Sequence, residues 1–400
     1  MLNYSERISS LKESATLALA QRVRELKAEG KDVIGLTLGE PDFDTPTHIK
    51  DAAAAALAAG HTSYPPVAGI PELRKAIAEK FRNENKLEVD VPNVAVSTGG
   101  KQTLYNVISC LLNPGDEVIL PAPYWVSYRA QLELASANIK EVLCGIEQQY
   151  KLTPTQLEAE LTPDTKLLIL TTPSNPSGSM YTQEELEAIG EVVARYPNLY
   201  VISDEIYEHI IYEVAHFSIG SIAAIKDRVI TVNGFAKGFA MTGWRLGFMA
   251  GPEKLVKLCM KLQGQVTSGA NTFAQWGAVT ALTSDLGPTY QMRDSFRSRR
   301  DDLYQKLSAI PHVDTLLPDG AFYFYPDLQA YLHTISPEGK KITTIDELCL
   351  YLIEEGGVVV VPGSAFGTQS HVRISYAYAV DMLHKAVDRL GDALTSLKPL

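Results

Sequence analysis

The sequence has little cysteine and no closely spaced cysteine pair. Only four cysteines occur in 400 residues, at Cys110, Cys144, Cys259 and Cys349, and none forms a C-x-x-C motif. This spacing argues against a disulfide framework and against a cysteine-based zinc site. The eight histidines include no H-E-x-x-H motif, so we expect no bound metal.

Long apolar runs and basic tracts are also missing. No stretch approaches the roughly 18 apolar residues that a membrane-spanning helix needs. Residues 1–31 mix acidic and basic side chains and lack the apolar core of a secretory signal. The net charge is −11, and no run of Lys and Arg could follow a phosphate backbone. We therefore expect a cytoplasmic protein that binds neither a membrane nor nucleic acid.

The sequence does contain a regular alternation of short apolar runs and amphipathic segments. Continuous apolar strands separated by helices predict an α/β domain with a mostly parallel sheet covered by helices on both faces. In such a sheet the ligand site lies at the carboxyl ends of the strands. The apolar runs are residues 93–97, 116–123, 165–173, 199–205, 228–234 and 246–251.

The pattern changes near residue 290, where a long charged amphipathic helix is predicted over 290–310. Shorter strands and a terminal helix follow, which indicates a smaller α+β domain. An N-terminal helix over residues 14–29 is expected to complete it. We therefore predict an N-terminal arm over 1–45, a large domain over 46–290 and a small domain over 291–400.

Polar and charged residues follow several of the predicted strands. Gly99, Gly100 and Lys101 lie where a strand ends and a helix begins, and a helix N-terminus favours a phosphate or carboxylate. The alternative is a tight turn that only joins the two elements. Asp204 closes another strand, so its carboxylate could face a bound ligand, or it could cap a following helix. Tyr207 could point to the same place.

A rigid loop is predicted at the same edge of the sheet. In "PSNPSG", Asn175 lies between two prolines, so the segment cannot continue as helix or as central strand. Its side-chain amide could bind a ligand there. A plain turn is the alternative.

One lysine and one arginine stand out in "NGFAKGFAMTGWRLGF", residues 233–248, because small and apolar residues surround them. Desolvation lowers the pKa of a buried lysine, so Lys237 could act as an amine nucleophile towards an aldehyde. Arg245 keeps its charge and suits a phosphate dianion. A reactive lysine, an aspartate for a ring nitrogen and a phosphate site together meet the requirements of pyridoxal 5'-phosphate (PLP).

Over nearly its whole length the sequence resembles the fold-type I, class I aminotransferases. The resemblance is carried by "LGEPDF", "PSNPSG", "SDEIYEHI", "GFAKGFAMTGWRLG" and "VRISYA", in that order. "STGGKQ" and "PAPYWVSY" resemble the bacterial and plant Iβ aspartate and prephenate aminotransferases. The resemblance implies the PLP-dependent transferase fold and a ping-pong transfer of an amino group between amino acid and 2-oxo acid substrates.

The resemblance also implies roles around the cofactor ring. Lys237 would hold PLP as a Schiff base and then move the proton, and Asp204 would keep the pyridine nitrogen protonated. Tyr207 and Asn175 would bind the phenolic oxygen. Tyr124 would stack on the ring, and Tyr124 and Asn175 would also lie beside the substrate.

Further roles concern the phosphate and the assembly. Gly99, Gly100, Lys101 and Arg245 would surround the phosphate. Tyr64 would reach the phosphate of a neighbouring subunit, so the resemblance implies a homodimer with shared active sites.

The resemblance assigns the substrate carboxylates as well. Arg373 would bind the substrate α-carboxylate through two parallel hydrogen bonds, and Gly39 would lie close to the same carboxylate. Lys101 could bind the distal carboxylate of aspartate, which favours transfer between L-aspartate and 2-oxoglutarate, or it could serve the phosphate only. Prephenate or aromatic amino acids are the alternative substrates. A PLP-dependent lyase and a regulator built on an aminotransferase domain are less well supported.

Two positions depart from the commonest pattern of these aminotransferases. Ala236 precedes the lysine where many members have serine, which removes one hydroxyl donor from the phosphate site. Gly238 follows the lysine where a bulkier residue is common. The sequence offers no physical reason for this glycine.

Overall fold

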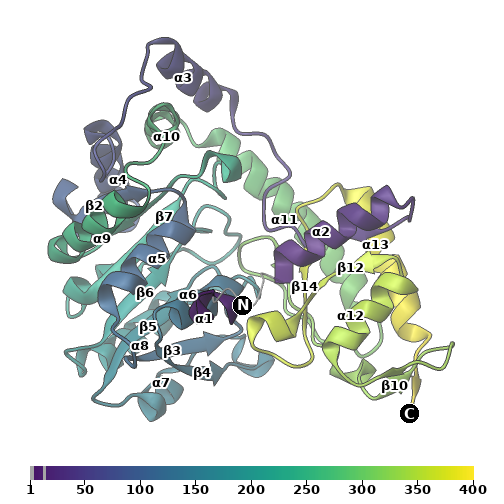
Figure 1. Ribbon diagram of the computed structural model, residues 1–400. Helices are drawn as coiled ribbons and strands as arrows, with labels where there is room; N and C mark the ends of the chain where they lie inside the picture. The colour runs from purple at the N-terminus through teal and green to yellow at the C-terminus, as the bar shows by residue number, and fades with distance from the viewer. Residues whose placement is uncertain (1–3, 12–14) are drawn as a thin grey trace.

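The larger part of the molecule is built on a seven-stranded sheet (Figure 1). A computed structural model describes residues 4–11 and 15–400. The strand order is β2-β8-β7-β6-β5-β3-β4, and β8 alone runs antiparallel to its neighbours. The expected mostly parallel sheet is therefore confirmed. The strands are β2 (Val94–Ser97), β3 (Glu117–Ala122), β4 (Asn138–Leu143), β5 (Thr165–Thr171), β6 (Tyr200–Asp204), β7 (Val229–Gly234) and β8 (Gly247–Ala250).

Strand β4 was not predicted, and its sequence explains why. It lies at the edge of the sheet, where it pairs only with β3. Its sequence, NIKEVL, alternates charged with apolar residues, and most of its side chains are at least partly exposed. An edge strand does not need the continuous apolar run that marks a strand buried on both faces.

Helices cover both faces of this sheet because successive strand residues point to opposite sides. In β3, Val118 and Leu120 pack against one group of helices, whereas Ile119 packs on the other face. The first face is covered by α5 (Gly100–Leu111), α6 (Val126–Leu134) and α9 (Glu253–Val266). The second is covered by α4 (Pro71–Asn83), α7 (Pro154–Glu160), α8 (Gln183–Ala194) and α10 (Thr272–Thr283), with α3 (Thr47–Ala58) packed on α10. Elements α3 to α10 with this sheet are called the large unit.

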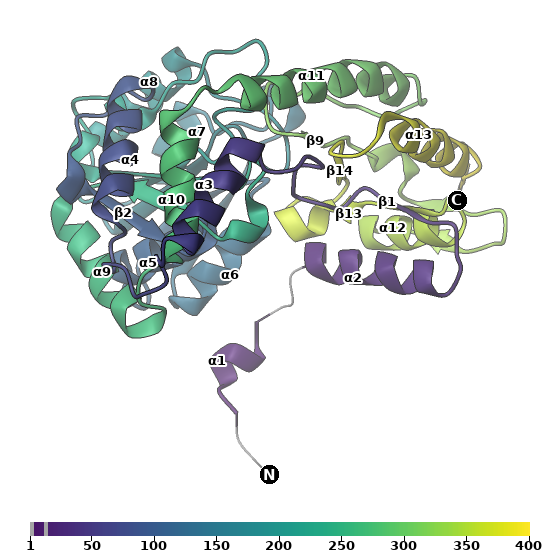
Figure 2. The same cartoon turned by 90° about the horizontal axis from the view of Figure 1, so that it is seen from above.

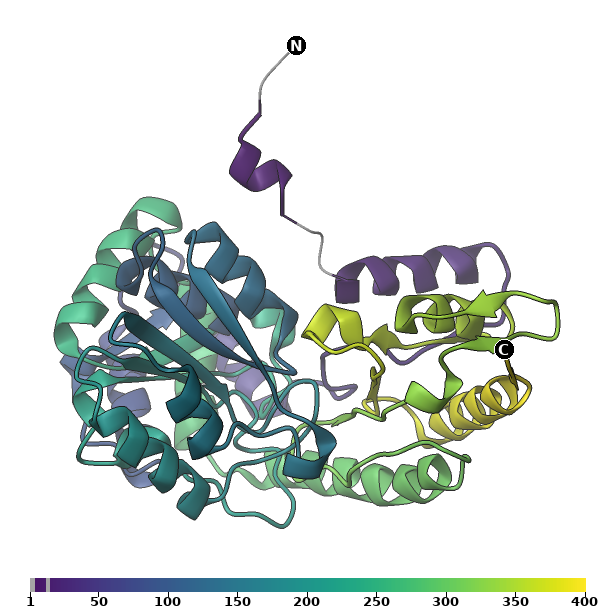
Figure 3. The same ribbon diagram turned by 90° about the horizontal axis from the view of Figure 1, so that it is seen from below.

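A second group of elements, the small unit, lies beside the large unit in Figures 1 and 3. Helix α11 (Gly287–Ser308) leads into it and begins earlier than predicted, because Pro288 is well suited to the first turn of a helix. The small unit has a hydrophobic core that includes Phe296, Phe322 and Leu390. Its other elements are β9 (Tyr323–Phe324), β10 (Thr334–Ile335), β11 (Lys341–Ile342), α12 (Ile345–Glu354), β12 (Val358–Val359), β13 (Val361–Pro362), β14 (Val372–Ser375), α13 (Val380–Thr395) and β15 (Lys398–Pro399).

The N-terminal segment joins the small unit. Strand β1 (Ile34–Gly35) pairs in parallel with β12, and α2 (Ala15–Ala28) contacts β1 and β13. Helix α1 (Glu6–Ser9) buries no side chain and lies away from both units in Figure 2. The domain boundaries at residues 45 and 290 stay predictions. No helix in the described part of the chain is long and apolar enough to cross a membrane.

Candidate active site

The predicted site residues follow strands whose carboxyl ends meet at one edge of the sheet. Gly99 and Gly100 follow β2, Asn175 follows β5, Asp204 ends β6 and Lys237 follows β7. Strand β2 points the same way as β7, since both are antiparallel to β8. Parallel strands thus bring residues far apart in sequence to one place, as expected for this fold class.

A cavity of about 390 Å³ opens at this edge, between the large unit and the small unit. The residues around it come from the strand ends, from the segment after β1 and from β14 of the small unit. Of the predicted site residues, it is lined by Gly39, Gly100, Lys101, Asn175, Asp204, Tyr207, Lys237, Arg245 and Arg373.

Lys237 lies in this cavity beside two aromatic rings. Its ammonium is 5.7 Å from the ring centre of Tyr207 and 5.9 Å from that of Phe322, and it donates to the carbonyl of Gly39. Burial lowers the pKa of Lys237 to about 8. About a tenth of the side chain is therefore a neutral amine at pH 7, and this is the form that attacks an aldehyde.

Asp204 is buried, and two donors hold its carboxylate. The hydroxyl of Tyr128 donates to Oδ2 at 2.7 Å, and the backbone N–H of Ile206 donates to Oδ1 at 3.2 Å. Burial raises the pKa of Asp204 to about 6, although these hydrogen bonds oppose the rise. No regular helix follows β6 directly, so Asp204 is not the cap of an α-helix. Its carboxylate faces the cavity and can accept a hydrogen bond from a ligand.

Arg373 is almost fully buried and is held by two acceptors. One guanidinium nitrogen donates to Asn175 Oδ1 at 3.0 Å, and the other terminal nitrogen donates to the carbonyl of Thr37 at 2.8 Å. Its Nε has no hydrogen-bond partner among the described residues. Neither contact is with a carboxylate, and among the described residues no acidic side chain forms an ion pair with this buried charge. A carboxylate ligand would supply that missing counter-charge.

Lys101 and Arg245 form a second positive end of the cavity. Burial and the nearby Arg245 both lower the pKa of Lys101. Arg245 has a left-handed backbone, with φ of 56°, and donates to the carbonyl of Thr242 at 2.9 Å. Across residues 4–11 and 15–400, no carboxylate lies within ion-pair distance of either cation. Two unpaired cations beside the N-terminus of α5 suit a phosphate dianion.

Gly99 does not line the cavity, but its lack of a side chain shapes it. It precedes α5 with φ of 86°, a conformation that favours glycine. A Cβ atom built there would overlap a guanidinium nitrogen of Arg245. Gly99 thus lets Arg245 approach the N-terminus of α5. The segment forms a tight turn, and the same turn brings a cation to the place where a phosphate could bind.

The predicted ring-stacking residue needs a correction. Tyr124 does not line the cavity around Lys237, and its ring packs against the backbone at Gly367. The next residue, Trp125, lines the cavity, and the centre of its ring lies 5.0 Å from the Lys101 ammonium nitrogen. The chain is extended at Trp125, and neighbouring side chains of an extended chain point to opposite sides. Trp125 is therefore the candidate for ring stacking.

Three site residues escaped the sequence analysis. Trp125 and Tyr128 occur in the quoted segment "PAPYWVSY", and an indole in that segment was a usable signal. Tyr323 lies on β9, and its hydroxyl is 2.8 Å from that of Tyr207. Nothing near Tyr323 in the sequence marks it, because this contact joins residues from different units.

Tyr64 lies outside the cavity, and 93% of it is exposed. A tyrosine this exposed on the single chain is free to contact another subunit. Its role at a partner's phosphate stays a prediction.

The two unusual positions beside Lys237 have different consequences. Ala236 lines the cavity, so no hydroxyl is present there. At Gly238, a Cβ atom would lie 2.8 Å from Nδ1 and 3.0 Å from Cβ of His209. The glycine is thus explained by the close packing of His209, which the sequence could not reveal.

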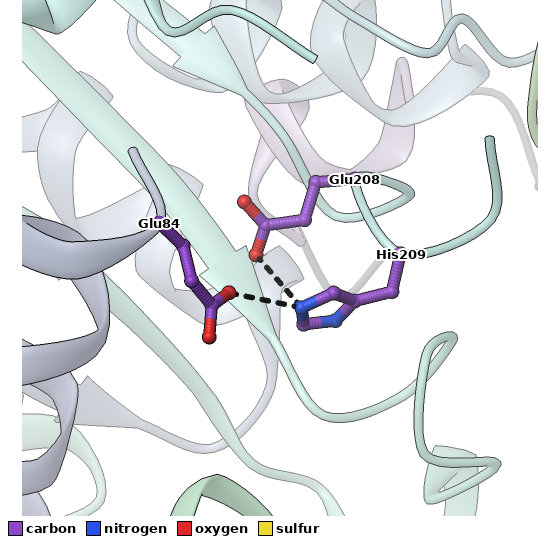
Figure 4. A group of neighbouring side chains, drawn as sticks. All are labelled: Glu84, Glu208 and His209. Atoms are coloured by element: carbon purple, nitrogen blue, oxygen red, sulfur yellow. Dashed lines mark hydrogen bonds and ion pairs between the residues drawn. The ribbon is translucent and has the colours of Figure 1, made fainter. Parts of the chain in front are cut away.

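His209 belongs to a cluster of charged residues behind the cavity. Figure 4 shows its ring between Glu84, at 3.1 Å, and Glu208, at 3.9 Å. Buried Lys80 donates to Glu208 and lies 3.4 Å from Glu84. The carboxylate oxygens of Glu84 and Glu208 and a ring nitrogen of His209 lie close enough together to hold a metal ion. The Lys80 ammonium already provides a positive charge beside Glu208. The expectation that the protein binds no metal stays a prediction.

Comparisons with known proteins identify the family of the chain. A family model described as aminotransferase class I and II matches residues 31–390. The chain is 45% identical to the aspartate/prephenate aminotransferase of Cereibacter sphaeroides over 96% of this chain and 97% of that protein. It is 43% identical to the aspartate aminotransferase of Geobacillus stearothermophilus over 97% and 98% of the two chains. The crystal structure of the aspartate aminotransferase from Rhizobium meliloti superposes with a TM-score of 0.96, at 40% identity, over 100% of both chains.

The expected fold is therefore confirmed, as is the expectation of an aminotransferase activity. The family match extends over both units and over the cavity between them. This protein belongs to the class I and II aminotransferase family.

Proposed function

We propose that this aminotransferase uses PLP to exchange an amino group between L-aspartate and 2-oxoglutarate by a ping-pong mechanism. The observation that carries the proposal is the convergence of Lys237, Asp204 and Arg373 on one cavity that has a second cationic end. The family implies PLP, and relatives that cover nearly the whole chain are named aspartate aminotransferases.

The residues present fit PLP. Lys237 has the lowered pKa that an amine needs to condense with an aldehyde and release water. Asp204 can hold a proton on a ring nitrogen, since its carboxylate is fixed by Tyr128. Arg245 would bind the phosphate at the N-terminus of α5. When bound, PLP supplies an electron sink for the negative charge that develops at the substrate Cα.

Other residues would position the amino acid and move its proton. Arg373 would bind the α-carboxylate, with Asn175 and the carbonyl of Thr37 holding the guanidinium in place. Lys237 would be the amine beside the substrate that takes up the Cα proton and holds it for return. A lyase would use the same lysine, so the family match and the named relatives are what favour transamination.

The substrate side chain is assigned through Lys101. Its ammonium lies at the cavity wall over Trp125, where it could pair with the distal carboxylate of aspartate. Prephenate is the second candidate substrate, since it also carries a second carboxylate and the relatives from Cereibacter sphaeroides and Petunia hybrida are named for it. Aromatic amino acids lack such a group.

We also propose that the enzyme is a cytoplasmic homodimer in which Tyr64 completes the partner's phosphate site. The exposure of Tyr64 on the single chain supports this proposal. Sedimentation of the holoenzyme would test it, because a monomer would leave Tyr64 without that role.

The substrate proposal is tested by following the visible absorption of the PLP-loaded protein. Aspartate should bleach the yellow band, and 2-oxoglutarate should restore it. A Lys101→Met variant should lose about tenfold or more in kcat/KM for aspartate, because a hydrogen bond to a charged group contributes about 1.5–3 kcal/mol. Lys257→Met, on an exposed face of α9, is the matched control.

One result would contradict the assignment of Lys101, and another would contradict the proposed cofactor. If Lys101→Met weakens PLP binding and slows aspartate and phenylalanine equally, Lys101 serves the phosphate and not the side chain. If the unmodified protein forms no yellow band with PLP, the proposed cofactor is wrong.

A further inference from the structure

Tyr323 carries a buried hydroxyl at the boundary between the two units that none of the roles above uses. It lies on β9 of the small unit and is fully buried. Its hydroxyl oxygen is 2.8 Å from that of Tyr207, which lies in the loop after β6 of the large unit. Within residues 4–11 and 15–400, neither hydroxyl has another hydrogen-bond partner.

The direction of this hydrogen bond follows from counting donors. A tyrosine hydroxyl has one proton to donate and can also accept. If Tyr207 donates its proton to the phenolic oxygen of the cofactor, it can only accept from Tyr323. Tyr323 would then be the donor, and a bond that Tyr207 accepts makes its own proton a better donor.

The ring of Tyr323 makes a second contact with the proposed machinery. The guanidinium carbon of Arg373 lies 4.5 Å from the centre of this ring, within the range of a cation–π interaction. The terminal nitrogens of Arg373 are already fixed by Asn175 and Thr37. The Tyr323 ring therefore covers the face of the Arg373 guanidinium, while Asn175 and Thr37 hold its edge. Together these contacts fix the plane of the guanidinium.

Gly39 shows that the space around this hydroxyl is limited. A Cβ atom at Gly39 would lie 3.2 Å from the Tyr323 hydroxyl oxygen, closer than ordinary contact. The absence of a side chain at Gly39 keeps the hydroxyl free to face Tyr207. The backbone of Gly39 also accepts from Lys237, so the three residues meet at one point.

We propose that Tyr323 is a positioning residue with two separable effects, the hydroxyl acting through Tyr207 on the cofactor and the ring acting through Arg373 on the substrate carboxylate. This inference rests on the proposed PLP function. It predicts that substitutions at one position change a cofactor property and a substrate property independently.

The test compares Tyr323→Phe, which keeps the ring, with Tyr323→Leu, which removes it. Tyr325→Phe is the matched control, because the hydroxyl of this buried tyrosine pairs with Thr368 Oγ1 at 2.6 Å, whereas that of Tyr323 pairs with Tyr207. Two quantities are measured on the PLP-loaded variants. They are the pKa of the imine nitrogen, from the pH dependence of the visible band, and the dissociation constant of succinate, an unreactive dicarboxylate.

Tyr323→Phe should raise the pKa of the imine nitrogen by roughly 0.3 to 1, because a weaker donor at Tyr207 leaves more negative charge on the oxygen that holds the imine proton. Succinate affinity should stay within about twofold, since the cation–π contact remains. Tyr323→Leu should show the same rise in pKa and a loss of about tenfold in succinate affinity. Tyr325→Phe should match the unmodified enzyme in both.

Several outcomes would overturn the inference. An unchanged imine pKa in Tyr323→Phe would remove the hydroxyl effect, and a loss of succinate affinity in that variant would contradict the assignment of substrate orientation to the ring. If Tyr323→Leu fails to fold, Tyr323→Met replaces it, and an unaltered succinate affinity there would remove the ring effect. Failure of the proposed function is distinct, because the unmodified protein would then show no visible band.

Discussion

The hydrogen bond between Tyr128 and Asp204 sets how readily the buried carboxylate ionises, and Tyr128→Phe removes it. Tyr128 is fully buried and its hydroxyl donates at 2.7 Å. Phenylalanine keeps the ring, so packing against the neighbouring helix changes little. The variant leaves the backbone N–H of Ile206 as the one remaining donor to the carboxylate in the described structure.

The size of the effect follows from two general magnitudes. A hydrogen bond to a charged group contributes about 1.5–3 kcal/mol, and one pKa unit corresponds to about 1.4 kcal/mol. Losing the bond should therefore raise the pKa of Asp204 from about 6 to roughly 7–8 in the protein without PLP. The donor stabilises only the ionised form, so the neutral form is nearly unaffected.

The same change should appear in stability, with a definite pH dependence. A carboxyl whose pKa is raised on folding favours the folded state while it stays protonated, and this contribution is lost as pH rises through the folded pKa. At pH 8.5 the Tyr128→Phe protein should therefore be less stable to unfolding than the unmodified protein by about 1–3 kcal/mol. The difference should shrink as pH falls from about 8 to 6, because Asp204 becomes protonated first in the variant and then in the unmodified protein.

The assay is carbon NMR of the protein without PLP, labelled at the aspartate carboxyl carbon, with Asp204→Asn to assign the signal. Tyr351→Phe is the control, since this buried hydroxyl donates to a carbonyl in the small unit at 3.1 Å. An Asp204 pKa that is the same in Tyr128→Phe and in the unmodified protein would refute the reasoning, because the bond would then not favour the ionised carboxylate.

Three further changes have defined outcomes. Gly238→Ala should lower the unfolding free energy by about 1–3 kcal/mol in urea titrations, since the new methyl group would overlap His209; equal midpoints would contradict this. Glu208→Gln should destabilise the protein at pH 7, and the difference should shrink as pH falls from 4.5 through the folded pKa of about 2, which Lys80 keeps low; a pH-independent difference in thermal unfolding would refute it. Arg373→Lys should lower kcat/KM for aspartate about tenfold or more, because an ammonium cannot bind a carboxylate through two parallel bonds; unchanged steady-state kinetics would remove Arg373 from the substrate site.

Much of the site was predictable because strand ends in a parallel sheet meet at one edge. Asp204, Asn175 and Lys237 follow strands that apolar runs identify, so their convergence required only the fold class. Lys237 was recognisable as a reactive amine because small and aromatic residues surround it in the sequence. The family resemblance then assigned Arg373, which lies on the small unit and has no local signal.

What could not be predicted depends on contacts between distant segments. Tyr124 and Trp125 are neighbours in an extended segment, so their side chains point to opposite sides and only one can face the cavity. The sequence does not show which of the two it is. The bond between Tyr323 and Tyr207 joins residues 116 positions apart. Gly238 is explained only by the packing of His209.

The central claim is that Lys237 is the amine that holds the cofactor, and chemical trapping tests it most directly. The protein is loaded with PLP, reduced with borohydride, digested and analysed by mass spectrometry, with Lys237→Ala treated in parallel. The account predicts one stable phosphopyridoxyl group on the peptide that contains Lys237, and none on the variant. A label on Lys101 or another lysine, or equal labelling of the variant, would contradict the account.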